Sequence, residues 1–259
     1  KKPAEKLIDT ILVDVKPLLP ALEEGESHLS DKAFGDLINL NGDPIFTREI
    51  IKPEQLLIKN NYLITNNQRR DSIFMIFRLP DMECIAAFGI NGRGPDEFSY
   101  PRIVETFEDS VLFYIYEMSN NKIYKVISRD MKPVFLYNFP EHENRVLSDK
   151  QIVFINNKNA LYVMSTAEGK AIFTFHADSF PQVRLLEDLR IPGLKGSWTT
   201  YIGDFGANMV FERLVFAYKY FKRMKVIDLK NMTKRNILFS AAALTEGQND
   251  IQNLEPTNI

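Results

Sequence analysis

From residue 54 onward, hydrophobic residues come in short bursts separated by a few polar positions. Two bursts, at residues 110–116 and 122–127, are rich in β-branched and aromatic side chains and flank Met118 to Asn121. Such runs are typical of β-strands, and paired asparagines favour a chain reversal because Asn tolerates positive φ. A third burst at residues 133–137 follows. The pattern therefore predicts three consecutive antiparallel strands.

The same pattern occurs in three further units. Their predicted strands span residues 62–65, 72–77 and 84–88; 152–155, 161–164 and 171–175; and 214–220, 224–228 and 236–239. The first turns of the four units lie near residues 69, 120, 157 and 222, at intervals of 51, 37 and 65 residues. Up-and-down sheets repeating every 40–50 residues or so are typical of β-propeller blades.

Longer polar stretches, such as residues 140–150 and 180–197, separate the strand triplets and favour blades over one continuous sheet. A small twisted sheet cannot bury both faces alone, whereas blades stacked around an axis can. The 19 Phe, 10 Tyr and single Trp are accordingly predicted to fill the seams between blades. A β-sandwich or barrel with long loops is the alternative architecture.

The first 50 residues do not repeat this pattern. Residues 5–15 fit either a helical stripe or a strand, and residues 34–46 predict a hairpin around Asn41 and Gly42. We therefore expect an entry segment at residues 1–30 and an all-β propeller domain of three- to four-stranded blades at residues 31–259.

The most distinctive stretch runs from Phe88 to Pro101 and contains Gly92, Gly94 and Pro95. It differs from a phosphate-binding loop because it lacks the third glycine and the Lys-Ser/Thr pair, and because a strand follows it where such loops lead into a helix. Its position predicts a crossing between the first two blades. In that crossing, Phe98 or Tyr100 plugs the gap between the blades.

This motif and the strand pattern resemble the six-bladed, TolB-like β-propeller proteins common in Bacteroidetes, many of which are lipoproteins. The residues that match their Gly-x-Gly-Pro-Gly-Glu-Phe/Tyr segment and its following proline are Gly92, Gly94, Pro95, Glu97, Phe98 and Pro101. The chain departs from that segment at Asp96.

The resemblance implies six blades, whereas the pattern shows four and a hairpin, so either the ring is incomplete or its blades are less regular. Propellers normally close by pairing an N-terminal strand with the last blade. The resemblance also implies export to the cell envelope and a lipid tether on a cysteine upstream of Lys1, with residues 1–30 as the tether. A cytoplasmic scaffold is the alternative, because one cysteine suits either compartment.

The overall composition excludes several classes of function. The formal net charge of −2, from 32 basic and 34 acidic residues, argues against a nucleic-acid-binding protein. No apolar run approaches the roughly 20 residues of a transmembrane helix. The single cysteine, Cys84, excludes an intramolecular disulfide or a cysteine-rich zinc site, and its place on a predicted strand indicates a buried structural thiol.

The sequence contains few residues in arrangements typical of catalysis or metal binding. His28, His142 and His176 lie far apart in sequence and are predicted to be surface residues, and a zinc-protease motif at His142 is broken by Val146. The sequence assigns no catalytic, cofactor-binding or metal-binding residue.

Three groups of residues are candidate binding sites. Asp204, Asn208 and Glu212 are candidate calcium ligands in a propeller channel. A second feature is the basic turn comprising Lys219, Lys222, Arg223 and Lys225. Its aromatic neighbours Tyr218, Tyr220 and Phe221 are predicted to lie between blades, with the lysines in solvent. Trp198, in a loop with Tyr201, is the preferred ligand-binding candidate.

The sequence thus predicts a non-enzymatic binding module for a protein, peptide or glycan. A hydrolase or lyase with a calcium-type metal in the channel is the alternative. The residues lining the channel distinguish the two, because convergent carboxylates indicate a metal and an apolar lining indicates binding through outer loops.

Overall fold

The computed structural model describes residues 24–30, 42, 50, 53–67, 71–94, 97–139, 152–166, 169–177, 182–208 and 211–240. Within these residues all 19 regular elements are β-strands, and the predicted all-β class is confirmed. The ambiguous element at residues 5–15, the hairpin at residues 34–46 apart from Gly42, and the polar stretch at residues 140–150 lie outside the described residues.

The first two blades are four-stranded antiparallel sheets. Blade 1 consists of β2 (Gln55–Lys59), β3 (Tyr62–Asn66), β4 (Phe74–Arg78) and β5 (Glu83–Phe88). The crossing to the next blade carries a short parallel pair, β6 (Ile90–Asn91) and β7 (Glu97–Phe98). Blade 2 consists of β8 (Pro101–Val104), β9 (Val111–Glu117), β10 (Lys122–Ile127) and β11 (Pro133–Asn138).

The last two blades follow the same up-and-down order. Blade 3 consists of β12 (Ile152–Phe154), β13 (Asn159–Thr166), β14 (Gly169–His176) and β15 (Gln182–Asp188). Blade 4 consists of β16 (Gly203–Asn208), β17 (Arg213–Tyr218), β18 (Arg223–Asp228) and β19 (Lys234–Ser240), and β1 (Gly25–Ser30) adds a fifth strand to it.

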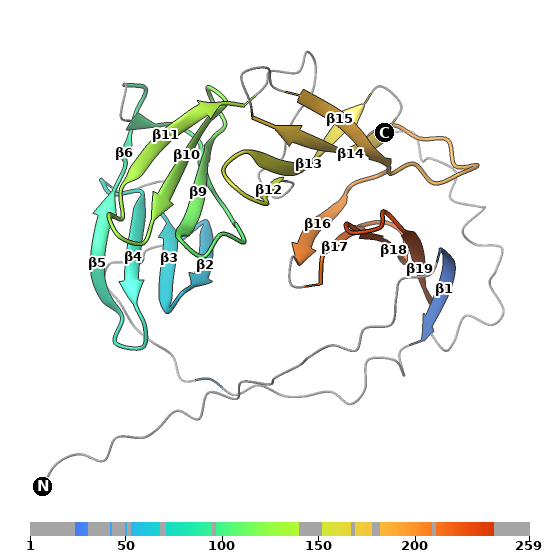
Figure 1. The fold of residues 1–259 in the computed structure, drawn as a ribbon, viewed down its shortest axis with the longest axis horizontal. Helices are drawn as coiled ribbons and strands as arrows, with labels where there is room; N and C mark the ends of the chain where they lie inside the picture. The colour runs from blue at the N-terminus through green and yellow to red at the C-terminus, as the bar shows by residue number, and fades with distance from the viewer. Residues whose placement is uncertain are drawn as a thin grey trace, which may run out of the picture.

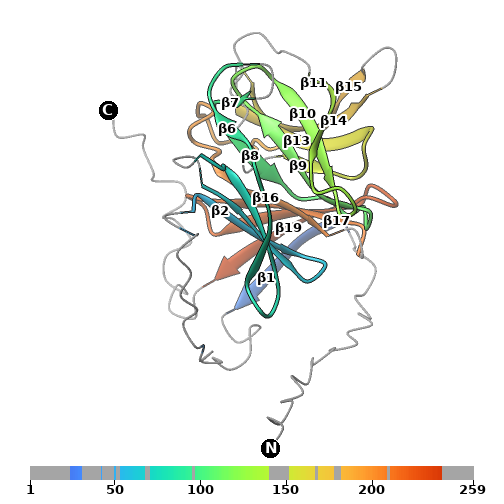
Figure 2. The ribbon, with the colours of Figure 1, turned by 90° about the vertical axis from the view of Figure 1, so that its left-hand side faces the viewer.

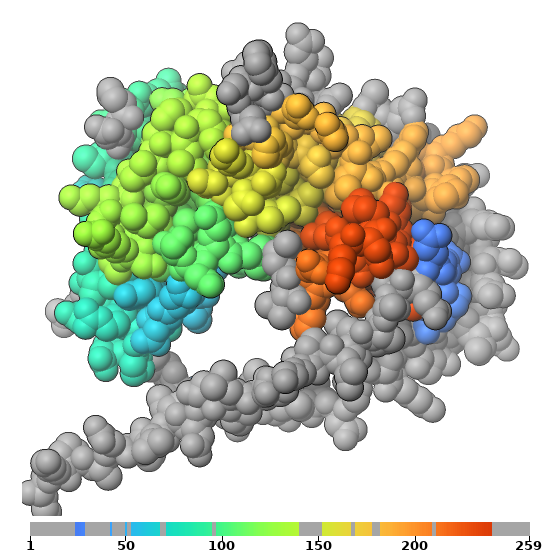
Figure 3. All heavy atoms as spheres, viewed as in Figure 1, coloured from blue at the N-terminus to red at the C-terminus, as the bar shows by residue number. Residues whose placement is uncertain are grey.

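The four blades follow one another around an axis in chain order (Figure 1). Their innermost strands β2, β8, β12 and β16 contact one another in succession. Separate hydrophobic clusters fill the seams between blades 1 and 2, 2 and 3, and 3 and 4. The described residues form no such cluster between blades 4 and 1. Figure 3 shows an open gap between the coloured atoms of these two blades. The described blades therefore form an open arc of a propeller.

Aromatic rings fill the seams, as predicted. Phe74 of blade 1 lies 5.8 Å from Phe113 of blade 2, measured between ring centres. Tyr114 of blade 2 stacks on Phe154 of blade 3 at 4.3 Å. All seven residues of β9 are buried, because this strand is covered by blade 1 on one face and by blade 3 on the other.

Each blade has four consecutive strands, the upper end of the predicted range, and blade 4 gains β1 as a fifth. The sequence pattern did not show several of these strands. Three are the innermost strands β2, β8 and β16; β8 has only four residues, and β16 contains Gly203 and Gly206. The fourth is β15, which lies inside the stretch interpreted as a polar separator at residues 180–197. Short or glycine-containing strands such as β8 and β16 give little periodicity, so local pattern alone does not reveal them.

Strand β1 lies at the end of the expected entry segment. It runs parallel to β19 on the outer edge of blade 4, with Gly25 opposite Arg235, and the two strands lie side by side in Figure 2. The Arg223 guanidinium also lies 3.3 Å from the Glu26 carboxylate. An N-terminal strand therefore pairs with the last described blade, as expected, and extends it outward.

Candidate functional site

The strand register places one set of connections at a common end of the blades. In an up-and-down antiparallel sheet, the entry into the first strand and the middle hairpin lie at the same end. Gln55 accordingly pairs with Asn66 in blade 1, and Pro101 pairs with Glu117 in blade 2. The described connections at this end, called the loop end below, include residues 89–94, 97–100, 118–121, 189–202 and 219–222.

Three exposed aromatic side chains lie at the loop end, each on a different connection. Tyr100 is 61% exposed, Trp198 46% and Tyr220 56%. The other strongly exposed ring among the described residues is Phe135, on the outer strand β11. Tyr and Trp are enriched at binding surfaces because they offer an apolar face together with a polar group. The loop end is therefore the best-supported binding surface of the described structure.

The glycine-rich motif forms the crossing between blades 1 and 2, as predicted. The Gly94 N–H donates to Oε2 of Glu97 at 2.7 Å, and the Ser99 hydroxyl donates to the Gly92 carbonyl at 2.7 Å. A Cβ at residue 92 would lie 1.9 Å from Oε2 of Glu97, so a side chain there would displace this carboxylate from the Gly94 N–H. Pro95 and Asp96 lie outside the described residues.

A buried carboxylate, that of Glu117 at the end of β9, holds the other side of the crossing. It accepts hydrogen bonds from the backbone N–H groups of Ser99 at 2.9 Å and Tyr100 at 3.0 Å. It also accepts from the Ser119 N–H at 3.1 Å and the Ser119 hydroxyl at 2.6 Å. Sequence reasoning missed Glu117. The available signal was a carboxylate ending an otherwise apolar strand.

The hairpin after β9 turns on asparagine, as predicted. Asn121 has φ of 55°, in the left-handed region, and its Oδ1 accepts the Tyr116 hydroxyl at 2.8 Å. Burial, with a smaller contribution from the Glu117 charge, raises the pKa of Tyr116 to about 12. Tyr116 therefore remains a neutral hydrogen-bond donor at physiological pH.

The two aromatic residues of the crossing have different roles. The Phe98 ring is buried, with its centre 5.7 Å from that of Phe74 in blade 1 and 5.3 Å from that of Tyr124 in blade 2. Phe98 is therefore the predicted plug between the blades. Tyr100 does not share this role, because its ring lies in solvent.

Trp198 lies in the connection between blades 3 and 4, and its predicted exposure is confirmed. The Lys170 ammonium of blade 3 lies 6.0 Å from its ring centre, and burial lowers the pKa of Lys170. Tyr201, from the same loop, is buried, and its hydroxyl donates to the Leu194 carbonyl at 2.8 Å. The surface candidate is thus Trp198 alone.

The structure separates the members of the basic turn. Lys219 and Lys222 are exposed, as predicted, whereas Lys225 lies in the blade 3–4 seam. Tyr220 is exposed, contrary to prediction, because it occupies the tip of the hairpin beyond β17. The Lys219 ammonium lies 5.5 Å from the Tyr220 ring centre.

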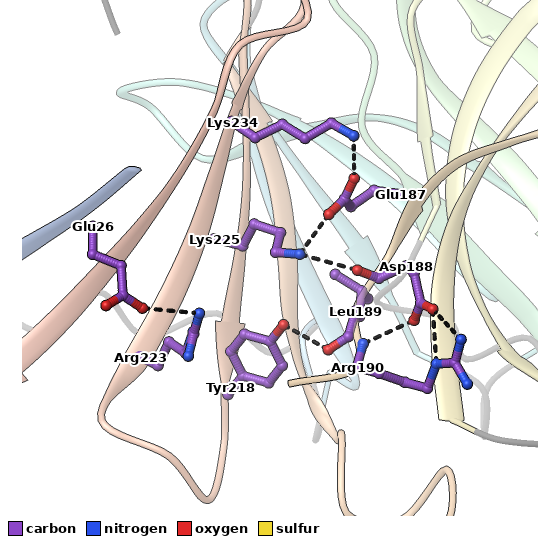
Figure 4. Close-up of polar contacts among 9 residues, drawn as sticks. All are labelled: Glu26, Glu187, Asp188, Leu189, Arg190, Tyr218, Arg223, Lys225 and Lys234. Atoms are coloured by element: carbon purple, nitrogen blue, oxygen red, sulfur yellow. Dashed lines mark hydrogen bonds and ion pairs between the residues drawn. The ribbon is translucent and has the colours of Figure 1, made fainter. Parts of the chain in front are cut away.

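Figure 4 shows the polar contacts that join blades 3 and 4. The Lys225 ammonium lies 2.5 Å from Oε1 of Glu187 and donates to the Asp188 carbonyl at 3.0 Å. Lys234 contacts Oε2 of the same Glu187 carboxylate, also at 2.5 Å. Sequence reasoning missed this cluster because its two halves lie nearly 40 residues apart, on different blades.

The channel wall carries few charges. A cavity of about 250 Å³ lies among the innermost strands and is lined by Gln55, Ile103, Val104, Glu105, Phe107, Ile152, Val153, Phe205, Gly206 and Ala207. Glu105 is the single carboxylate among these lining residues. Such a lining lacks the convergent carboxylates that would indicate a metal site. It is closer to the lining predicted for a protein that binds through its outer loops.

The candidate calcium ligands do not converge. Asp204 and Asn208 lie four positions apart on β16, about 13 Å by strand rise, and Glu212 follows in the next turn. The Asn208 side chain instead accepts the Phe211 N–H at 3.3 Å. Within the described part of the chain, no group of three or more His, Cys, Asp or Glu side chains is placed to hold a metal ion.

The histidines and the cysteine that the structure describes lie on different strands. His28 is exposed on β1, and His176 is half-buried with Nδ1 2.5 Å from Oδ1 of Asn159. His142 lies outside the described residues. Cys84 is exposed, so the prediction of a buried thiol is wrong; it lies on β5, the outermost strand of blade 1, which other elements cover only partly.

Solved structures of other proteins share the fold of this chain. No protein-family model and no curated protein matches the chain. A solved member of the DUF4221 family from Bacteroides vulgatus matches with a TM-score of 0.53 at 14% identity, over 70% of this chain and 56% of that chain. A Bacteroides fragilis protein provisionally described as exported matches with a TM-score of 0.53 at 10% identity, over 84% of this chain and 61% of that one.

The chain thus spans less than two thirds of either solved structure. At these identities the likeness concerns the fold alone. No helix in the described residues is long and apolar enough to cross a bilayer. Strand order, seam packing and these structural neighbours together make the protein a β-propeller, of which four blades are described.

Proposed function

We propose that the protein is a non-enzymatic binding module that holds a protein, peptide or glycan at the loop end. The observation that carries this proposal is the exposure of Tyr100, Trp198 and Tyr220 at one common end of the blades. The channel wall supports it, because Glu105 is the one ionisable residue among those that line the described cavity. The structural neighbours are compatible with such a role but do not identify a ligand.

The proposal is tested by probing a glycan array and a peptide array with the wild-type chain and with a Trp198→Ala, Tyr220→Ala, Tyr100→Ala triple variant. We expect at least one class of spot to bind the wild type and to lose about tenfold or more in affinity with the triple variant, since several exposed rings are removed. Phe135→Ala is the matched control, because it removes an exposed ring from an outer strand. Equal binding by the triple variant and the wild type contradicts the proposal.

We also propose that the protein is exported and tethered at the cell envelope by a lipid on a cysteine upstream of Lys1. The sequence resemblance supports this, as does the description of the Bacteroides fragilis neighbour as exported. We expect the full-length protein, labelled in cells with a fatty-acid analogue, to carry the label in the membrane fraction. Replacing the acceptor cysteine with serine should abolish labelling. Absence of label from the wild-type protein contradicts the tether.

A further inference from the structure

A polar pocket of about 400 Å³ lies at the loop end, between the glycine-rich crossing and the middle hairpin of blade 2. Its walls include Arg93, Glu97, Ser99, Tyr100, Ser119 and Asn120. This volume is in the lower part of the range for small-molecule sites, so it suits a small ligand or one unit of a longer chain. Neither the sequence motif nor the structural neighbours assign a role to this pocket.

The pocket walls are held in place by two carboxylates. Glu97 ties down one wall by accepting the Gly94 N–H, and its own N–H donates to the Gly94 carbonyl at 3.2 Å. Glu117 ties the opposite wall to the crossing through its hydrogen bonds with Ser99 and Ser119. A ligand therefore meets a largely preformed site, which lowers the entropic cost of binding.

Three side chains of the pocket are left available for a ligand. The Arg93 guanidinium is exposed and forms no ion pair or hydrogen bond with any residue that the structure describes. The Asn120 amide likewise has no hydrogen-bond partner among the described residues. The Tyr100 ring is exposed over most of its surface while its backbone is fixed by Glu117.

We infer that this pocket binds an acidic saccharide, a sugar unit bearing a carboxylate. The apolar face of a sugar ring stacks on Tyr100, its hydroxyls bond to Asn120, and its carboxylate pairs with the Arg93 guanidinium, whose planar fork matches a carboxylate. This inference rests on the proposed binding function and specifies the ligand for one site at the loop end.

The lining favours a saccharide over a peptide. Peptide anchors insert a large apolar side chain into an apolar cavity. None of the residues lining this pocket is aliphatic, and Tyr100 provides its one aromatic ring. A sugar suits such a lining because it has hydroxyl groups around its edge and a C–H face that can cover a single ring.

The test measures digalacturonate binding to the full chain by calorimetry, with galactobiose as the neutral counterpart. We expect digalacturonate to bind about three- to fivefold more tightly than galactobiose, because Arg93 is exposed and an ion pair with an exposed side chain contributes modestly. Arg93→Gln should abolish that preference, and Tyr100→Ala should weaken both sugars by about three- to tenfold. Trp198→Ala is the control at the other loop-end surface and should change neither affinity.

Each contrary outcome overturns a defined part of the inference. Equal binding of the two sugars removes the role of Arg93. Digalacturonate binding that is lost in Trp198→Ala and kept in Tyr100→Ala moves the site away from this pocket and leaves the proposed function standing. If neither sugar binds at millimolar concentration, the saccharide inference fails, and the arrays decide the proposed function separately. Unchanged melting temperatures of the variants verify that they fold, which is expected because Arg93 and Tyr100 are exposed.

Discussion

Replacing Phe98 by alanine should lower the free energy of unfolding by about 3–5 kcal/mol, the range for removing a buried phenylalanine ring. The ring is 3% exposed and packs against Phe74 of blade 1 and Tyr124 of blade 2. Its loss leaves a cavity where the chain crosses between the blades, and rigid sheets on either side can close such a cavity only in part. Urea denaturation followed by circular dichroism measures the change.

The matched control is Tyr100→Ala, which removes an aromatic ring two residues away in the same crossing. Because the Tyr100 ring is exposed and its fixed backbone is retained, we expect a change within about 0.5 kcal/mol. Phe98→Leu, which keeps most of the apolar volume, should fall between the two. Similar losses for Phe98→Ala and Tyr100→Ala would show that Phe98 does not join the blades.

The second large effect is expected at the blade 3–4 seam, where Glu187→Gln should cost about 3 kcal/mol. The Lys225 side chain is 12% exposed and the Glu187 side chain 11%, so the ammonium would lose its carboxylate in a largely water-free site. Breaking a buried ion pair from one side costs more than an exposed pair because the remaining charge cannot regain its hydration. Urea denaturation again provides the measurement.

Glu83→Gln is the control because it breaks the Arg78–Glu83 pair, whose side chains are 52% and 60% exposed. Exposed pairs contribute about 0–1 kcal/mol, so this substitution should be nearly neutral. Combining Glu187→Gln with Lys225→Met should recover part of the loss, since the unpaired buried charge is then removed. A cost for Glu187→Gln no larger than that for Glu83→Gln would refute this role of the cluster.

How far sequence reasoning reached can be seen by comparing Phe98 with Tyr100 and Trp198 with Tyr201. In each pair, the motif or loop was correctly identified, but the residue type did not reveal which ring is buried. Burial depends on the neighbouring blades that cover the residue, and for Phe98 the covering rings are Phe74 and Tyr124, which lie on different strands outside the motif. The same limit explains the error at Cys84, whose strand lies at the outer edge of its blade.

The sequence by itself determined the all-β class, most of the outer and middle strands, the asparagine turns and the crossing at Gly92, because alternation and turn chemistry are local properties. Only the tertiary structure decided the short innermost strands, the open arc of described blades, the contact of Glu187 with Lys225 and which aromatic rings are exposed at the loop end. These features arise from packing between blades, where residues distant in sequence exclude water from one another, and no short window of sequence contains both partners.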